Sequence, residues 1–521
     1  MAGKNPVDPV VMIGLDSAEP RLIERWINDG TMPNLKRLRS RGSYGRLAST
    51  AGWLAGSPWP TFYTGTLPSD HGMYHLPQWR AEQMRLDNPR SDWLPLLPFW
   101  RRLGKTGHRV VAVDVPMAYP PEPFNGVEVY GWATHDRDAR AGARECATTS
   151  YPPSVMNSIH CKGGRERSPL GEEIWGIEHP LALLRLRDQL IESAYNVADL
   201  AKALMQEEAW DLFIVCFGAT HRGGHKLWDH SGSWGTKGAG ELSHALRDVY
   251  VACDSAVGQL VGTVGNRATI IVFSVHGMGP NVDRSGVLPI MLARVLGKEA
   301  AHSPLQRLVH MVPGEVRYLA SSTQPLSSLY KLYTWRTQRR RKLISVDWAS
   351  TPAFCLPADK EGYIRVNLRG RESAGIVEPN DYDRLCETIA DGLETFVDAD
   401  TGQRIVESVD RIDRIFKQGL RLNNLPDLIV RWVSSPAANH RLIVSARYGS
   451  IPWATPGRHP TGRSGNHRAE GFLIAVGDRF QPDSRVEGGH ILDLAPAIYA
   501  LLNAPKPIEM RGNASSIIRT D

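Results

Sequence analysis

The stretch VVMIGLDSAEPRLIERWI, residues 10–27, decides the fold class, because a buried strand gives way to a helix within a few residues. The run from Val10 to Gly14 is continuously apolar, as in a strand that is covered on both faces. The pattern from Glu19 to Ile27 predicts a helix, and a second helix is predicted around Asn34 to Arg41. A strand followed by a helix is the repeating unit of a parallel sheet.

Similar apolar runs recur between helical stretches along the rest of the chain. They are Arg109–Val115, Leu212–Phe217, Ala268–Ser274, Leu428–Trp432 and Phe472–Val476. Their alternation with helices predicts an α/β fold, with a mostly parallel sheet covered by helices on both faces. Ligands of such sheets bind beyond the carboxyl ends of the strands, so the residues beside the run ends are the candidates for a functional site.

The chain of 521 residues is expected to form a single α/β domain, 1–521, with two insertions. Residues 75–180 are rich in Trp, Pro and Arg, and residues 290–345 end in a basic run. Both segments are expected to cap the site and to set substrate specificity. The basic run is interpreted as a solvated helix face, with an anion or membrane contact as the alternative. It consists of Arg336, Arg339, Arg340, Arg341 and Lys342.

Bulk composition narrows the classes of function. The net charge of +6 is small for this length, so it suits an anionic small molecule weakly and does not indicate nucleic acid. The six cysteines include no CxxC pair, which argues against a zinc ribbon and favours reduced thiols in a cytoplasmic protein. The N-terminus has no signal-peptide pattern and the apolar runs are too short to span a bilayer, so no membrane partner is expected. The sequence does not indicate an oligomeric state.

One aspartate and four histidines lie beside the ends of the predicted strands. Asp16 follows the first run, His276 follows Ala268–Ser274, and His467 precedes Phe472–Val476, while His221 and His225 follow Leu212–Phe217. Each alone could be structural, and Asp16 could cap the helix that comes after it. Their shared placement predicts one site, with metal-ligating atoms within roughly 4–6 Å of one another.

The pair His221 and His225 is the sharpest local signal. Residues four apart lie on one face of a helical turn, and this spacing is typical of zinc sites. Three protein ligands and an open position define a catalytic zinc site, and His467 could supply the third ligand. The alternative is a hydrogen-bonded histidine pair in a glycine-rich loop.

The segment TAGWLAGSPWPTFYTGTLPSDHG, residues 50–72, places Ser57 directly before Pro58. Ser-Pro is a natural helix start, in which the serine caps and the proline is the first helical residue. The serine either caps the helix alone or, beside a metal ion that lowers its pKa, acts as a nucleophile.

The chain carries in order the motifs IGLDSAEP, MPNLKRLRSRGSYGRLAST, SPWPTFYTGTLPSDHG, VDVPMAYPPEPFNGVEVYG, SVHGMG, GYIRVNLRGRE, NLPDLIVRW, GNHRAEGFLIAVG and ILDLAPAIYALL. It therefore resembles the type I phosphodiesterase/nucleotide pyrophosphatase family of the alkaline phosphatase superfamily. The resemblance implies an alkaline phosphatase-like fold and a metal-dependent hydrolase that acts on a small-molecule phosphate ester. It also implies two metal ions, usually zinc, with a Ser or Thr nucleophile between them.

Carried over by position, the ligands of the first ion become His221, His225 and His467. Those of the second ion become Asp16, Ser57, Val275 and His276.

Two departures from the family pattern affect these sites. The family has an aspartate where this chain has His221, so the first site becomes all-histidine and loses one negative charge. The family's DHG aspartate is Val275 here, and valine cannot bind a metal. The second site is therefore expected to bind its ion weakly, to take Mn²⁺ in place of Zn²⁺, or to use a nearby group such as Asp283.

The resemblance implies Ser57 as the nucleophile, with a local deletion, and Thr50 is the alternative; an ungapped alignment reaches Ala55, which cannot attack. The implied mechanism is in-line displacement at phosphorus through a phosphoseryl intermediate. The alternatives are a sulfatase or phosphonate hydrolase of the same superfamily, and a degenerate, non-catalytic member that keeps one metal.

Overall fold

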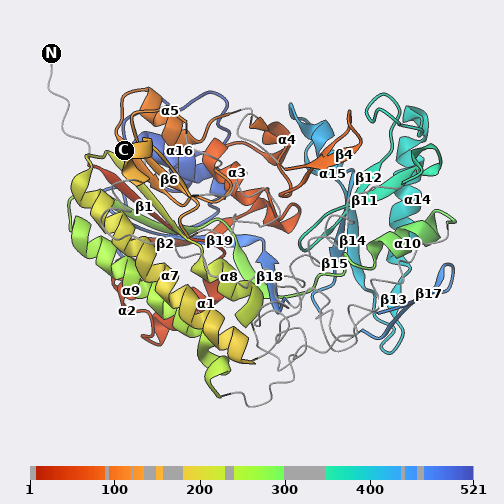
Figure 1. Ribbon diagram of the computed structural model, residues 1–521, viewed down its shortest axis with the longest axis horizontal. Helices are drawn as coiled ribbons and strands as arrows, with labels where there is room; N and C mark the ends of the chain where they lie inside the picture. Colours follow the sequence, from red (N-terminus) through yellow and green to blue (C-terminus); the bar gives the residue numbers. More distant parts are fainter. Residues whose placement is uncertain are drawn as a thin grey trace, which may run out of the picture.

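The computed structural model describes residues 8–88, 93–94, 96–118, 122–133, 148–156, 180–228, 240–298, 346–435, 440–453 and 463–519. A nine-stranded sheet lies at its centre, in the order β20-β2-β19-β9-β1-β8-β5-β6-β7 (Figure 1). The strands are β1 (Val10–Leu15), β2 (Ser43–Ala48), β5 (Val110–Val113), β6 (Gly126–Tyr130), β7 (Thr149–Tyr151), β8 (Leu212–Phe217), β9 (Thr269–Ser274), β19 (Glu470–Val476) and β20 (Ser484–Val486).

The middle of this sheet is parallel. Strand β1 pairs in parallel with β8 and β9, and β5 pairs in parallel with β8 and β6. Strands β19 and β7 run antiparallel to their neighbours. The predicted fold class, a mostly parallel sheet with helices on both faces, is confirmed. The expectation that Phe472–Val476 is a parallel strand is wrong, because β19 follows a short antiparallel strand and enters the sheet from the opposite end.

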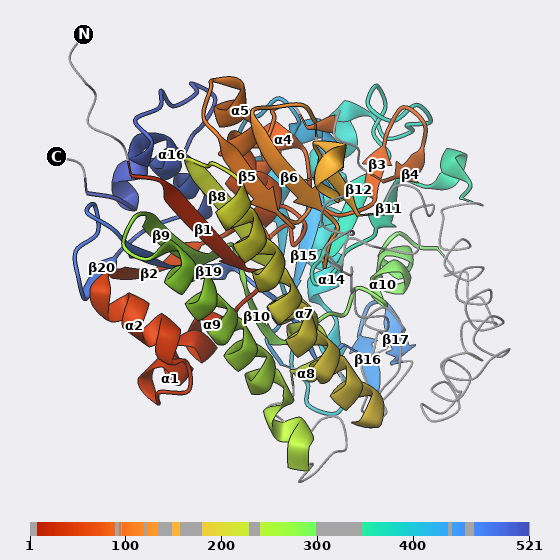
Figure 2. The same ribbon diagram turned by 60° about the vertical axis from the view of Figure 1, so that its left-hand side comes forward.

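Helices cover both faces because successive side chains of β1 point to opposite sides. Val11, Ile13 and Leu15 pack with α7 (Pro180–Glu207) and α9 (Ala245–Val264), and with α1 (Pro20–Asn28) and α2 (Pro33–Arg41). Val10 and Met12 pack on the other side with α3 (Pro58–Thr64), α5 (Phe99–Lys105) and α16 (Ile491–Leu501). Figure 2 shows α7 and α9 lying side by side along the sheet. Helices α1 and α2 begin and end close to the predicted bounds.

A second, four-stranded sheet lies beside the first (Figure 1). Its order is β11 (Ala353–Leu356), β12 (Gly362–Val366), β15 (Leu428–Trp432) and β14 (Val406–Arg411), and all its pairs are antiparallel. Helices α10 (Leu288–Val295) and α14 (Tyr382–Glu394) pack against it.

The prediction that Leu428–Trp432 belongs to the parallel sheet is therefore wrong. Leu428 and Val430 lie in the apolar cluster under α10 and α14, while Ile429 lies in a different cluster on the other face. A strand buried on both faces shows the same continuous apolar run in either kind of sheet, so the run could not tell them apart.

Smaller elements complete the described part. They are β10 (Gly277–Pro280) paired with β18 (Gly465–Arg468), the sheet of β13 (Val397–Asp398), β16 (Leu442–Ser445) and β17 (Gly449–Pro452), the hairpin of β3 (Gln78–Arg80) and β4 (Arg85–Asp87), and the helices α4 (Pro68–His71), α8 (Ala219–Leu227), α15 (Ile412–Ile415) and η1 (Thr50–Gly52).

The two segments expected as insertions differ in how much of them belongs to the central sheet. Within residues 75–180, α5 packs on the central sheet, and β5, β6 and β7 are three of its strands. Most of residues 290–345, with the basic run, lies outside the described residues.

Within the ranges given above, the helices lack an apolar stretch of the length needed to cross a bilayer. Cys253, Cys355 and Cys386 are free thiols.

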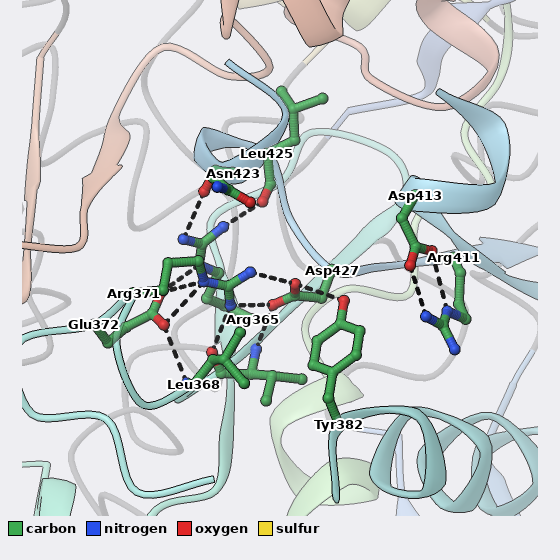
Figure 3. A network of polar contacts seen from close by, with 11 residues as sticks. Arg365, Leu368, Arg371, Glu372, Tyr382, Arg411, Asp413, Asn423, Leu425 and Asp427 are labelled. Atoms are coloured by element: carbon green, nitrogen blue, oxygen red, sulfur yellow. Dashed lines mark hydrogen bonds and ion pairs between the residues drawn. The ribbon is translucent and has the colours of Figure 1, made fainter. Parts of the chain in front are cut away.

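A buried polar network holds the second sheet together (Figure 3). Asp427 binds the Arg371 guanidinium at 2.6 and 2.7 Å, and it accepts hydrogen bonds from the Tyr382 hydroxyl at 2.8 Å and from the Val366 amide at 2.6 Å. Arg371 and Arg365 both contact Glu372. The charged residues of GYIRVNLRGRE and NLPDLIVRW thus join β12, β15 and α14, so the structure gives these motifs a structural role.

We predict that Asp427→Ala destabilises the fold by about 3–5 kcal/mol, because it leaves the buried Arg371 charge without its partner. Asp413→Ala is the matched control, since Asp413 pairs with Arg411 near the surface and such pairs contribute about 0–1 kcal/mol. The free energy of unfolding, from urea titration, should separate the two variants. Equal losses would contradict the assignment of Asp427 as the centre of the network.

The same carboxylate predicts a pH dependence. Burial disfavours ionisation, but Arg371 and the other hydrogen-bond donors outweigh it and lower the pKa of Asp427 below 3.8. Its contribution to stability is present above the unfolded pKa of about 3.9 and is lost as pH falls through the lower folded pKa. We therefore expect the difference in unfolding free energy between wild type and Asp427→Asn to shrink on acidification below about pH 4. A difference that stays constant with pH would contradict this assignment.

Candidate metal centre

The predicted site residues lie at the carboxyl ends of three neighbouring strands. Asp16 directly follows β1, His276 directly follows β9 and Val275, and α8 begins two residues after β8. The Asp16 amide donates to the Phe217 carbonyl at 3.0 Å, and the Thr220 hydroxyl donates to the Asp16 carbonyl at 2.6 Å. These two bonds fix the start of α8 over the end of β1.

Three histidines meet here through the same ring atom. The Nε2 atom of His221 lies 2.9 Å from Nε2 of His225 and 3.0 Å from Nε2 of His467. All three side chains are buried, and their nitrogens lie within 4.8 Å of one another. His221 and His225 sit one turn apart on α8, while His467 comes from β18. The spacing of four residues therefore gives the geometry expected from the sequence.

Two glycines allow the β10–β18 ribbon to approach α8. A side chain at Gly224 would meet Met278 of β10 at 2.7 Å, and one at Gly465 would meet the Gly224 carbonyl at 2.1 Å. The close approach lets His225 Nδ1 donate to the Gly465 carbonyl at 3.0 Å. This bond places the proton on Nδ1 and leaves the Nε2 lone pair facing the other histidines.

Asp16 lies directly behind His221. One carboxylate oxygen accepts a hydrogen bond from His221 Nδ1 at 2.8 Å, and the other accepts from the indole nitrogen of Trp59 at 2.9 Å. His276 Nε2 is 3.8 Å from the second oxygen, and its ring centroid is 4.6 Å from that of His467. The structure therefore brings together Asp16 and all four predicted histidines.

The start of α3 lies beside this group, because Trp59 belongs to its first turn. The Ser57 hydroxyl does not cap the helix: it donates to the Leu54 carbonyl at 2.7 Å and lies 2.6 Å from Thr50 Oγ1. Thr50 belongs to η1, where a side chain on Gly52 would come within 3.0 Å of Ala469, next to β18. The two candidate nucleophilic hydroxyls are thus hydrogen-bonded to each other.

The remaining candidate positions do not join the histidines. Val275 is buried in the apolar cluster that also contains Trp59 and α16. Asp283 accepts a hydrogen bond from the Ser285 amide at 2.7 Å, and burial raises its pKa to about 7. Across the described ranges, His221, His225 and His467 are the group of three metal-ligating side chains that lie close enough together to hold one ion.

Three polar residues that the sequence analysis did not single out lie near the histidines. Asp359 contacts Arg463 and His75, each at 3.4 Å. Burial, followed by the positive charge of Arg463 and the neighbouring imidazoles, holds the pKa of His225 well below its usual value. These residues come from separate loops, and no sequence motif links them. Their proximity therefore becomes visible only in the folded structure.

The donor set fits a divalent transition metal. Tetrahedral zinc binds imidazole nitrogen at about 2.0–2.1 Å, which places its ligands about 3.4 Å apart. The observed separations of 2.9 and 3.0 Å are close to that value. Neutral imidazole is the ligating form, and three histidines leave a fourth position for water or substrate.

Comparison with known proteins bears on family and fold. A family model described as type I phosphodiesterase / nucleotide pyrophosphatase matches residues 10–437. Phosphonoacetate hydrolase from Sinorhizobium meliloti 1021, in complex with phosphonoacetate, is similar in fold, with 13% identity, a TM-score of 0.50 and coverage of 96% of both chains. Its complex with phosphonoformate has 13% identity, a TM-score of 0.48 and the same coverage. The search of curated proteins found no significant match.

We predict that His225→Ala and His467→Ala each weaken binding of Zn²⁺ by more than the roughly 10–100-fold expected when only a hydrogen-bond partner of a ligand is lost. His490→Asn is the matched control, because His490 caps α16 through Leu492 and asparagine is also a good cap. Calorimetric titration of metal-stripped protein gives the affinities. Wild-type affinity in the two alanine variants would place the metal elsewhere.

Proposed function

The chain belongs to the type I phosphodiesterase/nucleotide pyrophosphatase family, and from that premise we propose that it is a metal-dependent phosphoester hydrolase whose ion is held by His221, His225 and His467. The observation that carries the proposal is the convergence of three buried Nε2 atoms at the carboxyl ends of the sheet strands. Ligands of open α/β sheets bind at this edge. Zn²⁺ is the proposed ion, because imidazole suits it and three protein ligands leave an open position.

The ion, when bound, would supply Lewis-acid polarisation of a phosphoryl oxygen and activation of water. The residues of the chain do the rest. The Gly465 carbonyl and the Asp16 carboxylate accept from His225 Nδ1 and His221 Nδ1, which keeps both Nε2 atoms directed inward. Arg463 lies close enough to raise the positive potential at the histidines, which favours an anionic substrate.

We propose Ser57 as the nucleophile on two grounds. Its hydroxyl is not used as a helix cap, and Trp59, two residues further on, touches Asp16 at 2.9 Å. In the reaction the Ser57 hydroxyl would lose its proton to solvent and form a bond to phosphorus, while the bond from phosphorus to the leaving oxygen breaks and that oxygen takes up a proton. Water then hydrolyses the phosphoseryl ester.

A substrate screen tests the proposed class. Purified protein should be assayed with phosphate monoesters, phosphate diesters, nucleotide pyrophosphates, phosphonates and sulfate esters, with added Zn²⁺ or Mn²⁺. Metal-dependent release from at least one phosphate ester is expected. Phosphonates are included because the neighbour in fold is a phosphonoacetate hydrolase. Turnover of sulfate esters alone, or of none of the compounds by metal-loaded protein, would overturn the proposal.

We predict that Ser57→Ala lowers kcat by roughly a thousandfold or more while the ion stays bound, because it removes the attacking oxygen and no histidine. Thr50→Val is the matched variant, since it removes the neighbouring hydroxyl and keeps the shape of the side chain. It should retain most of the activity. The reverse result would assign attack to Thr50, and full activity in both variants would assign it to water.

A further inference from the structure

The family holds two metal ions, but the residues at the second position do not fit one. Of the four positions that would supply ligands, Val275 carries no donor and is buried among apolar side chains. The Ser57 hydroxyl donates to the Leu54 carbonyl at 2.7 Å. Asp16 and His276 remain, and two protein donors fall short of the three that a catalytic zinc site uses.

The charge balance also opposes a second cation. Two-metal sites place their ions about 3.5–4 Å apart, so the two positive charges need anionic ligands between and around them. Imidazole binds a metal ion as the neutral base, so the three histidines would add no negative charge, and Asp16 is the one carboxylate among the family's ligand positions in this chain. One negative charge among the ligand positions themselves offsets part of the charge of one divalent ion and leaves a second without an anionic ligand.

The Trp59 indole binds the Asp16 oxygen that does not contact His221. Its N–H donates to Asp16 Oδ1 at 2.9 Å, and its ring lies in the same apolar cluster as Val275. A second cation beside Asp16 would need open space and anionic ligands. The Trp59 indole instead places a hydrogen-bond donor and an apolar ring there. Valine at 275 and tryptophan at 59 are consistent with each other, because an aspartate at 275 would face that apolar cluster.

The other oxygen of Asp16 acts on the first ion through His221. Oδ2 accepts from His221 Nδ1 at 2.8 Å, while Nε2 of the same ring points to His225 and His467. A carboxylate that receives the second ring proton of a metal-binding histidine fixes the tautomer and orientation of the ring and raises its basicity. This arrangement makes Asp16 a positioning residue.

We propose that this chain holds a single ion in a three-histidine centre, that Asp16 positions His221 and is not itself a ligand, and that the Trp59 N–H stands where a second cation would bind. The inference rests on the proposed function only in taking His221, His225 and His467 as the ligands. It differs from the family pattern in the number of ions, one in place of two. It also makes Asp16 a positioning residue and makes Trp59 the group that excludes a second ion.

Metal stoichiometry tests the number of ions. Metal-stripped wild type and His276→Ala should be titrated with Zn²⁺ by calorimetry, and bound metal counted by mass spectrometry after gel filtration. Both proteins should bind one equivalent, with affinities within about threefold of each other, because His276 is not a ligand of this ion. Two equivalents in the wild type, with one lost in His276→Ala, would overturn the inference and leave the hydrolase proposal standing. Absence of any bound ion would overturn both.

A double-mutant cycle tests the role of Asp16. Asp16→Asn should keep one equivalent and weaken Zn²⁺ binding by about 10–100-fold. In a His221→Ala background the same change should have no further effect, because the ring through which Asp16 acts is gone. A direct ligand would instead weaken binding in both backgrounds.

The absorption spectrum of bound Co²⁺ gives a readout that does not depend on affinity. At saturating Co²⁺, Asp16→Asn should show the visible bands of the wild type, since the atoms bound to the ion are the same. A changed band pattern would make Asp16 a ligand. Circular dichroism confirms that each variant is folded, and Trp59→Phe, which removes the indole N–H and keeps an aromatic ring, should likewise keep one ion and the wild-type bands.

Discussion

Three buried imidazole rings, with Nε2 of His221 at 2.9 and 3.0 Å from Nε2 of His225 and His467, form the constraint on which the centre of this molecule depends. Buried rings this close cannot all be protonated, because the positive charges would repel one another without solvent to screen them. The surrounding structure keeps them neutral and oriented: Gly465 and Asp16 receive the Nδ1 protons, and burial lowers the pKa of His225 and His467. A cation between the rings would turn this crowding into a stable arrangement.

The elements around the rings are placed so that the three imidazoles can meet. Helix α8 must lie over the end of β1 for His221 to reach Asp16, and Gly224 lets the β10–β18 ribbon come close enough to bring in His467. The central sheet supplies the fixed edge, since β9, β1 and β8 are adjacent parallel strands. The central sheet accounts for this frame, and the histidine at position 221 completes the all-histidine group.

Much of this was predictable from local pattern. The apolar run after Val10 and the helix after Glu19 indicate an α/β fold, and the spacing of His221 and His225 places two rings on one face of a helix. Local sequence pattern did not predict features that depend on contacts between residues far apart in the sequence. The run at Leu428 is the same for a strand in either kind of sheet, and the indole of Trp59 reaches Asp16 across 43 positions. Asp359, Arg463 and His75 meet through loops that share no motif.

The pairing of His467 with His221 spans 246 positions of the chain. An ion held by both rings would act as a crosslink that closes a very long loop, and the entropy cost of closing such a loop grows only slowly with its length. Binding free energy at a site that the unfolded chain lacks is also folding free energy. The bound ion would then join the ribbon of β10 and β18 to α8, and the C-terminal part of the chain, already paired with the central sheet through β19, would gain a second attachment that varies with the supply of metal.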